Sequence, residues 1–166
     1  MKSLILIRHA KSSWSTDVLN DFDRPLNERG KREAPEMALK LIKNKVVIDF
    51  FVSSPAKRAK KTAKLFIKEF GKDENEILFI PELYHAGTQI FTKIISELND
   101  NYSTVAIFSH NPGITEFANT LTEVQIDNMP TCSVFAIKAS IEHWKQFAES
   151  DKAFWFFNYP KLETEH

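Results

Sequence analysis

Residues 4–14 read LILIRHAKSSW, and the four apolar residues at their start run directly into Arg8 and His9. A continuous apolar run predicts a strand over residues 3–7 that is buried on both faces, as in a parallel sheet covered by helices. Such a strand normally ends in a turn of Gly, Asn or Asp, whereas this one ends in an arginine and a histidine. Because ligands of parallel sheets bind at the carboxyl ends of the strands, these two residues are candidates for a functional site.

Length and composition favour a single globular domain over residues 1–166. Of the 166 residues 43% are hydrophobic, and 22 basic residues balance 22 acidic ones. A net charge of zero argues against a general nucleic-acid or membrane binder, so any anion site has to be local. Cys132 is the single cysteine, which leaves no intrachain disulfide, and no apolar run approaches the ~20 residues of a membrane span. We therefore predict a soluble, cytoplasmic protein that binds neither nucleic acid nor membrane.

Alternating apolar runs and amphipathic stretches predict an α/β protein, a three-layer α/β/α fold with a mostly parallel central sheet. Strands are expected at residues 3–7, 48–53, 77–80, 104–109, 132–138 and 153–157, the last of them at an edge. Helices are expected at residues 28–43, 55–70 and 88–98, from residue 112 onward, and at 143–148. The expected caps are Asn27, Ser54 and Asn111 at helix starts and Gly71 at a helix end.

Three predicted strand ends bring two arginines and two histidines to one edge of the sheet. Arg8 and His9 follow the first strand, Arg58 lies on the first helical turn after the second, and His110 follows the fourth. Arginine matches phosphate oxygens two at a time, helix N-termini favour anions, and a neutral histidine can be a nucleophile. Together they predict a site for a phosphate dianion, although each piece alone is also typical of a surface ion pair or a solvated helix face.

Five segments resemble the histidine phosphatase superfamily, which also holds the phosphoglycerate mutases, and especially its small bacterial phosphohistidine phosphatases of the signal-inhibitory type. They are LIRHAKSSW at 6–14, DFDRPLNERGKREA at 21–34, VSSPAKRAKKTA at 52–63, PELYHA at 81–86 and IFSHNPG at 107–113. The resemblance implies a phosphoglycerate mutase-like fold and a metal-independent phosphatase with no cofactor. The superfamily pattern Arg-His-Gly is broken by Ala10, so the turn after His9 must have a negative φ or be strained.

The resemblance implies a role for each residue of the phosphate site. His9 matches the histidine that becomes phosphorylated, and Arg8, Arg58 and a protonated His110 match the other three members of the pocket. In the implied reaction, neutral His9 attacks phosphorus in line while the other three stabilise the charge on the equatorial oxygens. Water then cleaves the phosphohistidine, and no metal is required because fixed cations supply the positive charge.

Further residues near this site are candidates for acid catalysis, for phosphate binding or for shaping the loop. Glu82, in PELYHA, corresponds to an acid that protonates the leaving group in related enzymes, and Arg24, in DRPL, is implied to reach the substrate phosphate. An alkoxide leaving group needs such an acid, whereas a protonated imidazole leaves readily. The need for Glu82 therefore depends on the substrate. Ser12 and Ser13 either donate to phosphate or shape the loop, and shaping is the simpler interpretation.

The favoured function is dephosphorylation of phosphohistidine on a signalling or phosphocarrier protein. The resemblance implies a histidine phosphotransfer domain or a sugar-transport phosphocarrier as partner. Most of the chain is assigned to core elements, so little is left for a lid, and an open pocket favours a protein side chain. Two alternatives stay open: a broad-specificity phosphomonoesterase of small phosphoesters that needs Glu82, and a non-catalytic phosphate-binding module. The residues do not indicate an oligomeric state.

Overall fold

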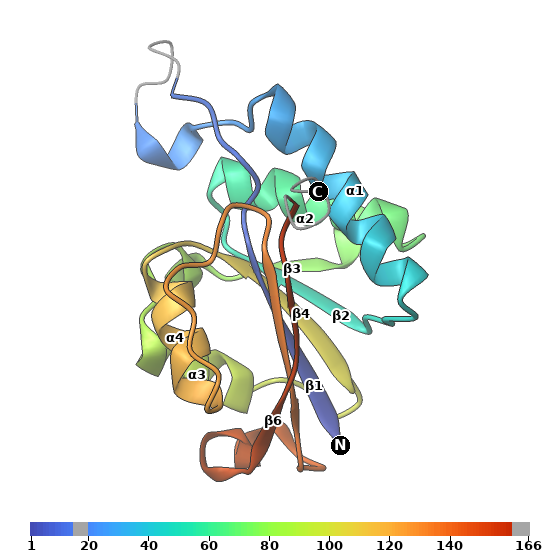
Figure 1. Cartoon of the computed structure of the whole chain (residues 1–166), viewed down its shortest axis with the longest axis vertical. Helices are drawn as coiled ribbons and strands as arrows, with labels where there is room; N and C mark the ends of the chain where they lie inside the picture. Colours follow the sequence, from blue (N-terminus) through green and yellow to red (C-terminus); the bar gives the residue numbers. More distant parts are fainter. Residues whose placement is uncertain (15–19, 161–166) are drawn as a thin grey trace.

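The computed structural model describes residues 1–14 and 20–160, which contain a six-stranded sheet in the order β3-β2-β4-β1-β5-β6 (Figure 1). Strands β3, β2, β4 and β1 are parallel, β5 is antiparallel to β1, and β6 is antiparallel to β5. The predicted, mostly parallel sheet is thereby confirmed, and the last strand lies at an edge as expected. The strands are β1 (Lys2–Arg8), β2 (Phe50–Ser53), β3 (Ile77–Phe79), β4 (Thr104–Ser109), β5 (Val134–Ala139) and β6 (Lys152–Asn158).

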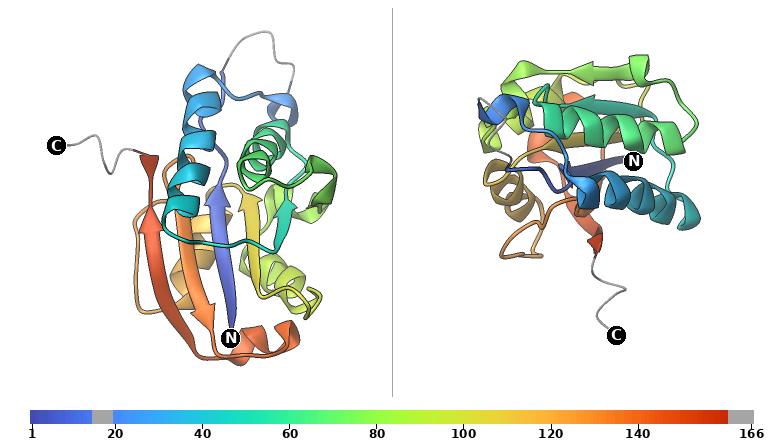
Figure 2. Two further views of the ribbon diagram at one scale, coloured as in Figure 1. Left: turned by 90° about the vertical axis from the view of Figure 1, so that its right-hand side faces the viewer. Right: turned by 90° about the horizontal axis from the view of Figure 1, so that it is seen from above.

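Two pairs of α-helices cover the two faces of the sheet (Figures 1 and 2). The α-helices are α1 (Glu28–Lys43), α2 (Lys57–Glu69), α3 (Thr88–Ser96) and α4 (Gly113–Leu121). The described chain also contains short 3-10 helices: η1 (Asp21–Asp23), η2 (Glu74–Glu76), η3 (Pro81–His85) and η4 (Trp144–Glu149). In the described part of the chain, no helix is both long and apolar enough to span a membrane.

Strand β1 contributes to a hydrophobic core on each side of the sheet. Leu4 and Leu6 belong to the core that includes α3 and α4, whereas Ile5 and Ile7 belong to the core that includes α1 and α2. All four side chains are fully buried. A strand covered on both faces needs apolar residues at every position rather than at alternate positions, which is why the continuous run LILI forms it.

Two helix ends are confirmed as the sequence predicted them. Asn27 is the N-cap of α1, and its side-chain oxygen accepts a hydrogen bond of 2.8 Å from the backbone N–H of Gly30. After α2, Gly71 has a φ of +74°, the left-handed conformation in which glycine commonly ends a helix. These ends are encoded locally, by one side chain or one backbone preference, and are therefore readable from the sequence.

The start of α2 differs from the prediction. The helix begins at Lys57 with Ala56 at the N-cap, two residues later than a cap at Ser54 would place it. The Ser54 hydroxyl instead accepts a hydrogen bond from the backbone N–H of Ala56 and lies 2.8 Å from Nε2 of His110. His110, 56 residues further along the chain, thus contacts the Ser54 side chain that the sequence predicted as the helix cap.

The start of α4 and the start of β5 are also displaced from their predicted positions. Pro112, rather than Asn111, is the N-cap of α4, and the Asn111 side-chain oxygen accepts a hydrogen bond from the Thr115 hydroxyl. Strand β5 begins at Val134 because Cys132 has a φ of +62°, which is incompatible with an extended strand. The Cys132 N–H donates to the backbone oxygens at the end of β1 and so ties this turn to the functional edge of the sheet.

Candidate active site

A pocket of about 430 Å³ lies at the carboxyl ends of the parallel strands, the end of the sheet beside η1 in Figure 2. Its lining includes Arg8 and His9 at the end of β1, Arg58 from the first turn of α2, and His110 immediately after β4. The four side chains that the sequence selected therefore surround one pocket. Their places are established by this geometry, whereas their roles in a reaction stay predictions.

The imidazole of His9 is held as one particular neutral tautomer. Its Nδ1 lies 2.8 Å from the backbone oxygen of Ala10, which can only accept a hydrogen bond, so Nδ1 carries the proton. Its Nε2 receives a hydrogen bond of 3.3 Å from Nε of Arg58. Burial is the main reason why the pKa of His9 lies well below its usual value of 6.5. A neutral ring with its lone pair on Nε2 is the form that a nucleophilic histidine requires.

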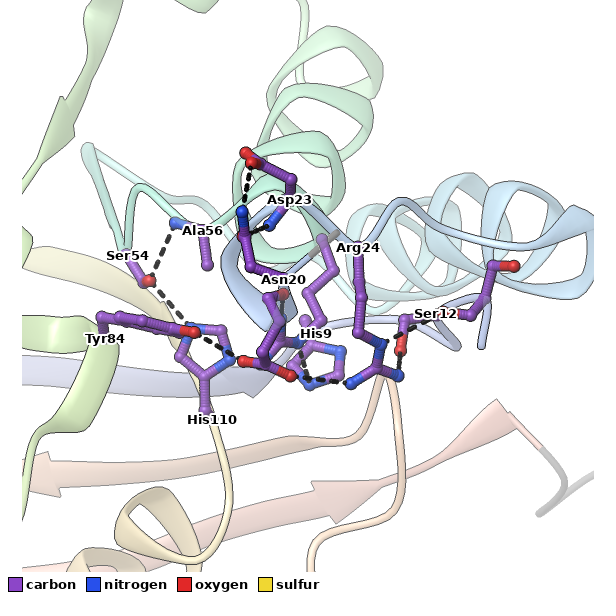
Figure 3. Close-up of polar contacts among 12 residues, drawn as sticks. His9, Ser12, Asn20, Asp23, Arg24, Ser54, Ala56, Tyr84 and His110 are labelled. Atoms are coloured by element: carbon purple, nitrogen blue, oxygen red, sulfur yellow. Dashed lines mark hydrogen bonds and ion pairs between the residues drawn. The ribbon is translucent and has the colours of Figure 1, made fainter. Parts of the chain in front are cut away.

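His110 lies beside His9, with ring centroids 5.2 Å apart, and it too is neutral. Burial, followed by the charge of Arg58, lowers the pKa of His110 to about 3, so the ring is neutral in the ligand-free site. The protonated His110 that the resemblance implies belongs to the reaction with bound phosphate and stays a prediction. The Ser54 hydroxyl is within 2.8 Å of Nε2 of His110, as Figure 3 shows. A bound dianion would favour the protonated ring again, because an opposite charge stabilises the charged form.

Two buried nitrogen atoms of the pocket have no hydrogen-bond partner among the described residues. They are Nε of Arg8 and Nδ1 of His110. The Arg8 side chain is fixed by a hydrogen bond of 2.9 Å from its Nη1 to the backbone oxygen of Met129. A buried polar atom without a partner costs about 1–3 kcal/mol. Oxygens of a bound anion would satisfy such atoms, which fits a phosphate site.

Asp21 is the acidic residue that lines the pocket in the described part of the chain, and it is the centre of the hydrogen-bond network there. Its carboxylate accepts hydrogen bonds from the Tyr84 hydroxyl at 2.6 Å, from Nη2 of Arg58 at 2.9 Å and from Nη1 of Arg24 at 3.0 Å. These hydrogen bonds, that from Tyr84 first, hold the pKa of Asp21 well below its usual value of 3.8. Asp21 is therefore a permanent anion at the pocket wall.

Arg24, which the resemblance selected for substrate phosphate, does line the pocket. Figure 3 shows it on the side of His9 opposite to His110. Besides Asp21, it donates to the Ser12 hydroxyl and, over 3.1 Å, to the backbone oxygen of Ser13. Its guanidinium carbon lies 3.3 Å from the ring centroid of Trp14. Ser12 and Ser13 thus hold Arg24 in place, in agreement with a role in shaping the loop.

Glu82 is not brought to the pocket by the structure. Its side chain is exposed, and η3 contributes Tyr84 and His85 to the pocket lining in its place. Its role as an acid stays a prediction. Asp21 and Tyr84 are the site residues that sequence reasoning missed, although both lie in quoted motifs, three residues before Arg24 and two after Glu82. Within residues 1–14 and 20–160, no three His, Cys, Asp or Glu side chains are grouped to hold a metal ion.

Ala10 is accommodated without backbone strain. Among the described residues other than glycine, positive φ values occur at Lys45 and Cys132, so Ala10 is at negative φ. Its side chain is fully buried, and its N–H donates to the Thr62 hydroxyl at 2.9 Å. The expectation that the turn after His9 has a negative φ is therefore confirmed.

The amino-acid sequence of this chain is similar to a known protein family and to other proteins. A family model, the histidine phosphatase superfamily (branch 1), matches residues 4–84, a range that includes His9, Arg24 and Arg58. The chain belongs to the histidine phosphatase superfamily. The chain is also similar to an uncharacterized chloroplastic protein of Arabidopsis thaliana, to which it is 31% identical over 163 residues that cover 93% of this chain and 74% of that protein. Membership of the superfamily makes this chain an enzyme of the phosphatase or mutase type.

Solved structures of this histidine phosphatase fold superpose over almost the whole chain. The SixA protein of Agrobacterium tumefaciens has a TM-score of 0.78 at 24% identity and covers 96% of this chain and 98% of its own. The protein histidine phosphatase SixA in complex with tungstate has a TM-score of 0.82 at 20% identity, with 95% and 97% covered. The fold predicted from the resemblance is thereby confirmed.

Proposed function

We propose that this histidine phosphatase hydrolyses phosphohistidine on a protein, through a phosphohistidine intermediate on its own His9. The observation that carries the proposal is the buried, neutral imidazole of His9, with its Nε2 lone pair beside the guanidinium of Arg58. Arg8 and His110 each add to the same pocket a buried nitrogen atom that has no partner among the described residues. A nucleophile surrounded by donors for three phosphate oxygens is what in-line phosphoryl transfer requires.

In the first step, Nε2 of His9 attacks phosphorus and forms a P–N bond while the P–N bond of the substrate breaks. Before this attack, Arg58 donates to a phosphate oxygen instead of to Nε2, which frees the nucleophile's lone pair, and the electron pair of the broken P–N bond goes to the leaving imidazole nitrogen. The positive charge that develops on the His9 ring is stabilised through Nδ1–H by the backbone oxygen of Ala10. In the second step, a water oxygen attacks phosphorus, its proton goes to the released phosphate, and Nε2 regains its lone pair.

The charge state of Asp21 supports phosphohistidine as the substrate. A carboxylate with a strongly lowered pKa cannot donate the proton that a leaving alkoxide needs. It does favour the protonated ring of a bound phosphohistidine, which takes the electron pair of the breaking P–N bond and leaves as neutral imidazole with no further proton. With Glu82 exposed and outside the pocket lining, the described residues suit an imidazole leaving group better than an alkoxide.

The fold neighbours agree with this choice of substrate. One of them is described as a protein histidine phosphatase and binds tungstate, a tetrahedral oxyanion like phosphate. The partner of the present chain would accordingly be a phosphorylated histidine phosphotransfer domain or phosphocarrier. A phosphohistidine side chain on such a partner would enter the pocket at the carboxyl ends of the strands.

The decisive experiment compares turnover of a phosphohistidine-bearing protein with that of p-nitrophenyl phosphate, for the wild type, His9→Ala and His143→Ala. His143 is exposed and hydrogen-bonded to Asp100, so its replacement is the matched control. We expect turnover of phosphohistidine and an acid-labile, alkali-stable phosphoenzyme in the wild type and the control, and neither in His9→Ala. Preference for the aryl phosphate would instead identify a general phosphomonoesterase, and binding of phosphate without any turnover would identify a binding module.

A further inference from the structure

A second hollow of about 580 Å³, which we call the lysine groove, lies between η1, α1 and α2. Phe22 and Asp23 of η1 form one wall, and Phe22 is 37% exposed. The other walls carry five lysines, Lys31 from α1 and Lys57, Lys60, Lys61 and Lys64 from α2. On α2 these residues follow the spacing of one helix face, so their charges lie in a single stripe.

The lysine groove adjoins the phosphate pocket across the η1 segment. Asp21 and Arg24 line the pocket, whereas the intervening Phe22 and Asp23 line the groove. A molecule whose phosphate is held by Arg58 therefore has the lysine groove on the other side of η1. A molecule that occupies both the pocket and the groove must extend across η1. A polypeptide is long enough to do so, whereas a small phosphoester is not.

The positive charge of the lysine groove is mostly unneutralised. Among the described residues, Lys57, Lys60 and Lys61 form no ion pair, while Lys31 and Lys64 have long contacts of 3.5 Å and 3.8 Å with Glu28 and Glu74. Within residues 1–14 and 20–160, the groove lining contains one carboxylate, that of Asp23. In a chain whose formal net charge is zero, this is a local concentration of charge.

The placement of these lysines also opposes the stability of α2. The helix begins at Lys57, and its first turn contains no acidic residue. The N-terminus of a helix carries a partial positive charge, so a lysine there is electrostatically unfavourable. A sequence selected for stability and solubility alone would place acidic residues at these positions. Local conflicts of this kind are typical of functional sites.

We propose that the lysine groove binds acidic side chains that flank the phosphohistidine of the protein substrate. This inference rests on the proposed function and assigns to it a class of partner, a protein with an acidic surface beside its phosphorylated histidine. Lysines held along one groove attract such a surface within the screening length of about 8 Å at physiological salt. Phe22 supplies an apolar contact in the same groove.

The test uses two synthetic peptides, each phosphorylated on a single histidine, one with flanking glutamates and one with glutamines in their place. The groove variant is Lys57→Glu/Lys60→Glu/Lys61→Glu. The control variant, Lys68→Glu/Lys93→Glu/Lys145→Glu, makes the same change in net charge at exposed lysines outside the lysine groove. Acidic residues at the start of α2 favour the helix dipole, so the groove variant is expected to melt no lower than the wild type.

We expect the wild type and the control variant to prefer the acidic peptide, in kcat/KM, by about tenfold, equivalent to ~1.4 kcal/mol. The groove variant should lose that preference, and added salt should weaken it in the wild type. A wild type without preference, or a groove variant that keeps it, would overturn the docking role while leaving the proposed function intact. A wild type that hydrolyses neither peptide nor free phosphohistidine would overturn the proposed function itself.

Discussion

Arg58 is bound at once to the candidate nucleophile and to an internal anion. Its Nε donates to Nε2 of His9 at 3.3 Å, and its Nη2 lies 2.9 Å from the carboxylate of Asp21. Its Nη1 donates to the backbone oxygen of Asp21 at 2.7 Å. Asp21 thus occupies donors that a substrate phosphate would use. Phosphate has to compete with this carboxylate for Arg58, and the competition has measurable consequences.

Replacing Asp21 by asparagine should tighten the binding of inorganic phosphate by about tenfold, or ~1.4 kcal/mol. The change removes a negative charge next to the phosphate position while leaving an oxygen that can still accept from Tyr84. Isothermal titration calorimetry measures the dissociation constant directly. Asp23→Asn is the matched control, because Asp23 belongs to the same 3-10 helix and lines the lysine groove instead. Weaker binding in Asp21→Asn would mean that the carboxylate mainly positions the arginines.

Glu82→Gln should leave hydrolysis of phosphohistidine within about twofold of the wild type. Its exposed side chain lies outside the pocket lining, and an imidazole leaving group does not need a carboxylic acid beside it. Steady-state kinetics on phosphohistidine and p-nitrophenyl phosphate distinguish the possibilities. If the activity of Glu82→Gln falls more than tenfold on both substrates, Glu82 reaches the reaction centre in the enzyme–substrate complex. The role implied by the resemblance is then correct.

Both pocket histidines should stay neutral at pH 5. Their imidazole ¹⁵N chemical shifts should therefore remain those of the neutral ring, whereas a histidine in the unfolded chain titrates near 6.5. The lowered pKa of His110, about 3, also predicts lower stability in acid. Below pH 6.5 the unfolded chain binds a proton that the folded chain does not, so the free energy of unfolding falls with pH. For His110 the loss at pH 5 is about 2 kcal/mol, measurable by urea unfolding at pH 7 and pH 5.

Gly113→Ala should destabilise the fold by about 1–3 kcal/mol or more, because a methyl group there has no room. A Cβ at Gly113, the first residue of α4, would clash with the backbone oxygen of Ala86, which lies between η3 and α3. Gly87→Ala is the control, since a Cβ at that position meets nothing within 4 Å. Thermal melting of both variants tests the difference. Equal melting temperatures would show that η3 can move away from α4 at little cost.

The elements that the sequence predicted well are those whose signals are local. The continuous run LILI, the period of α1 and the cap at Asn27 each depend on neighbours within a few residues. The convergence of Arg8, His9, Arg58 and His110 was also predictable, because parallel strands place their carboxyl ends together. Family resemblance then supplied roles that the residues alone did not.

The errors and omissions depend on contacts between distant parts of the chain. Ser54 does not cap α2, because its hydroxyl lies against His110, and Asn111 does not cap α4, because Thr115 uses its oxygen. Asp21 was overlooked because its partner Tyr84 lies 63 residues away. The neutral state of His110 in the ligand-free site was not predictable, because the degree of burial, which sets its pKa, is not encoded in any short motif.

The stacking of Trp14 on Arg24 gives this protein a built-in optical reporter. Of the three tryptophans, Trp144 is fully buried in the core on the other side of the sheet from α1, and Trp155 of β6 packs against the core that includes α1 and α2. Trp14 is 76% exposed and lies in the pocket wall. Its indole face is 3.3 Å from a guanidinium carbon whose nitrogens also bind Asp21. An oxyanion that draws Arg24 toward itself would change the environment of this indole. Emission from Trp14 should therefore follow ligand entry in real time, with no label attached.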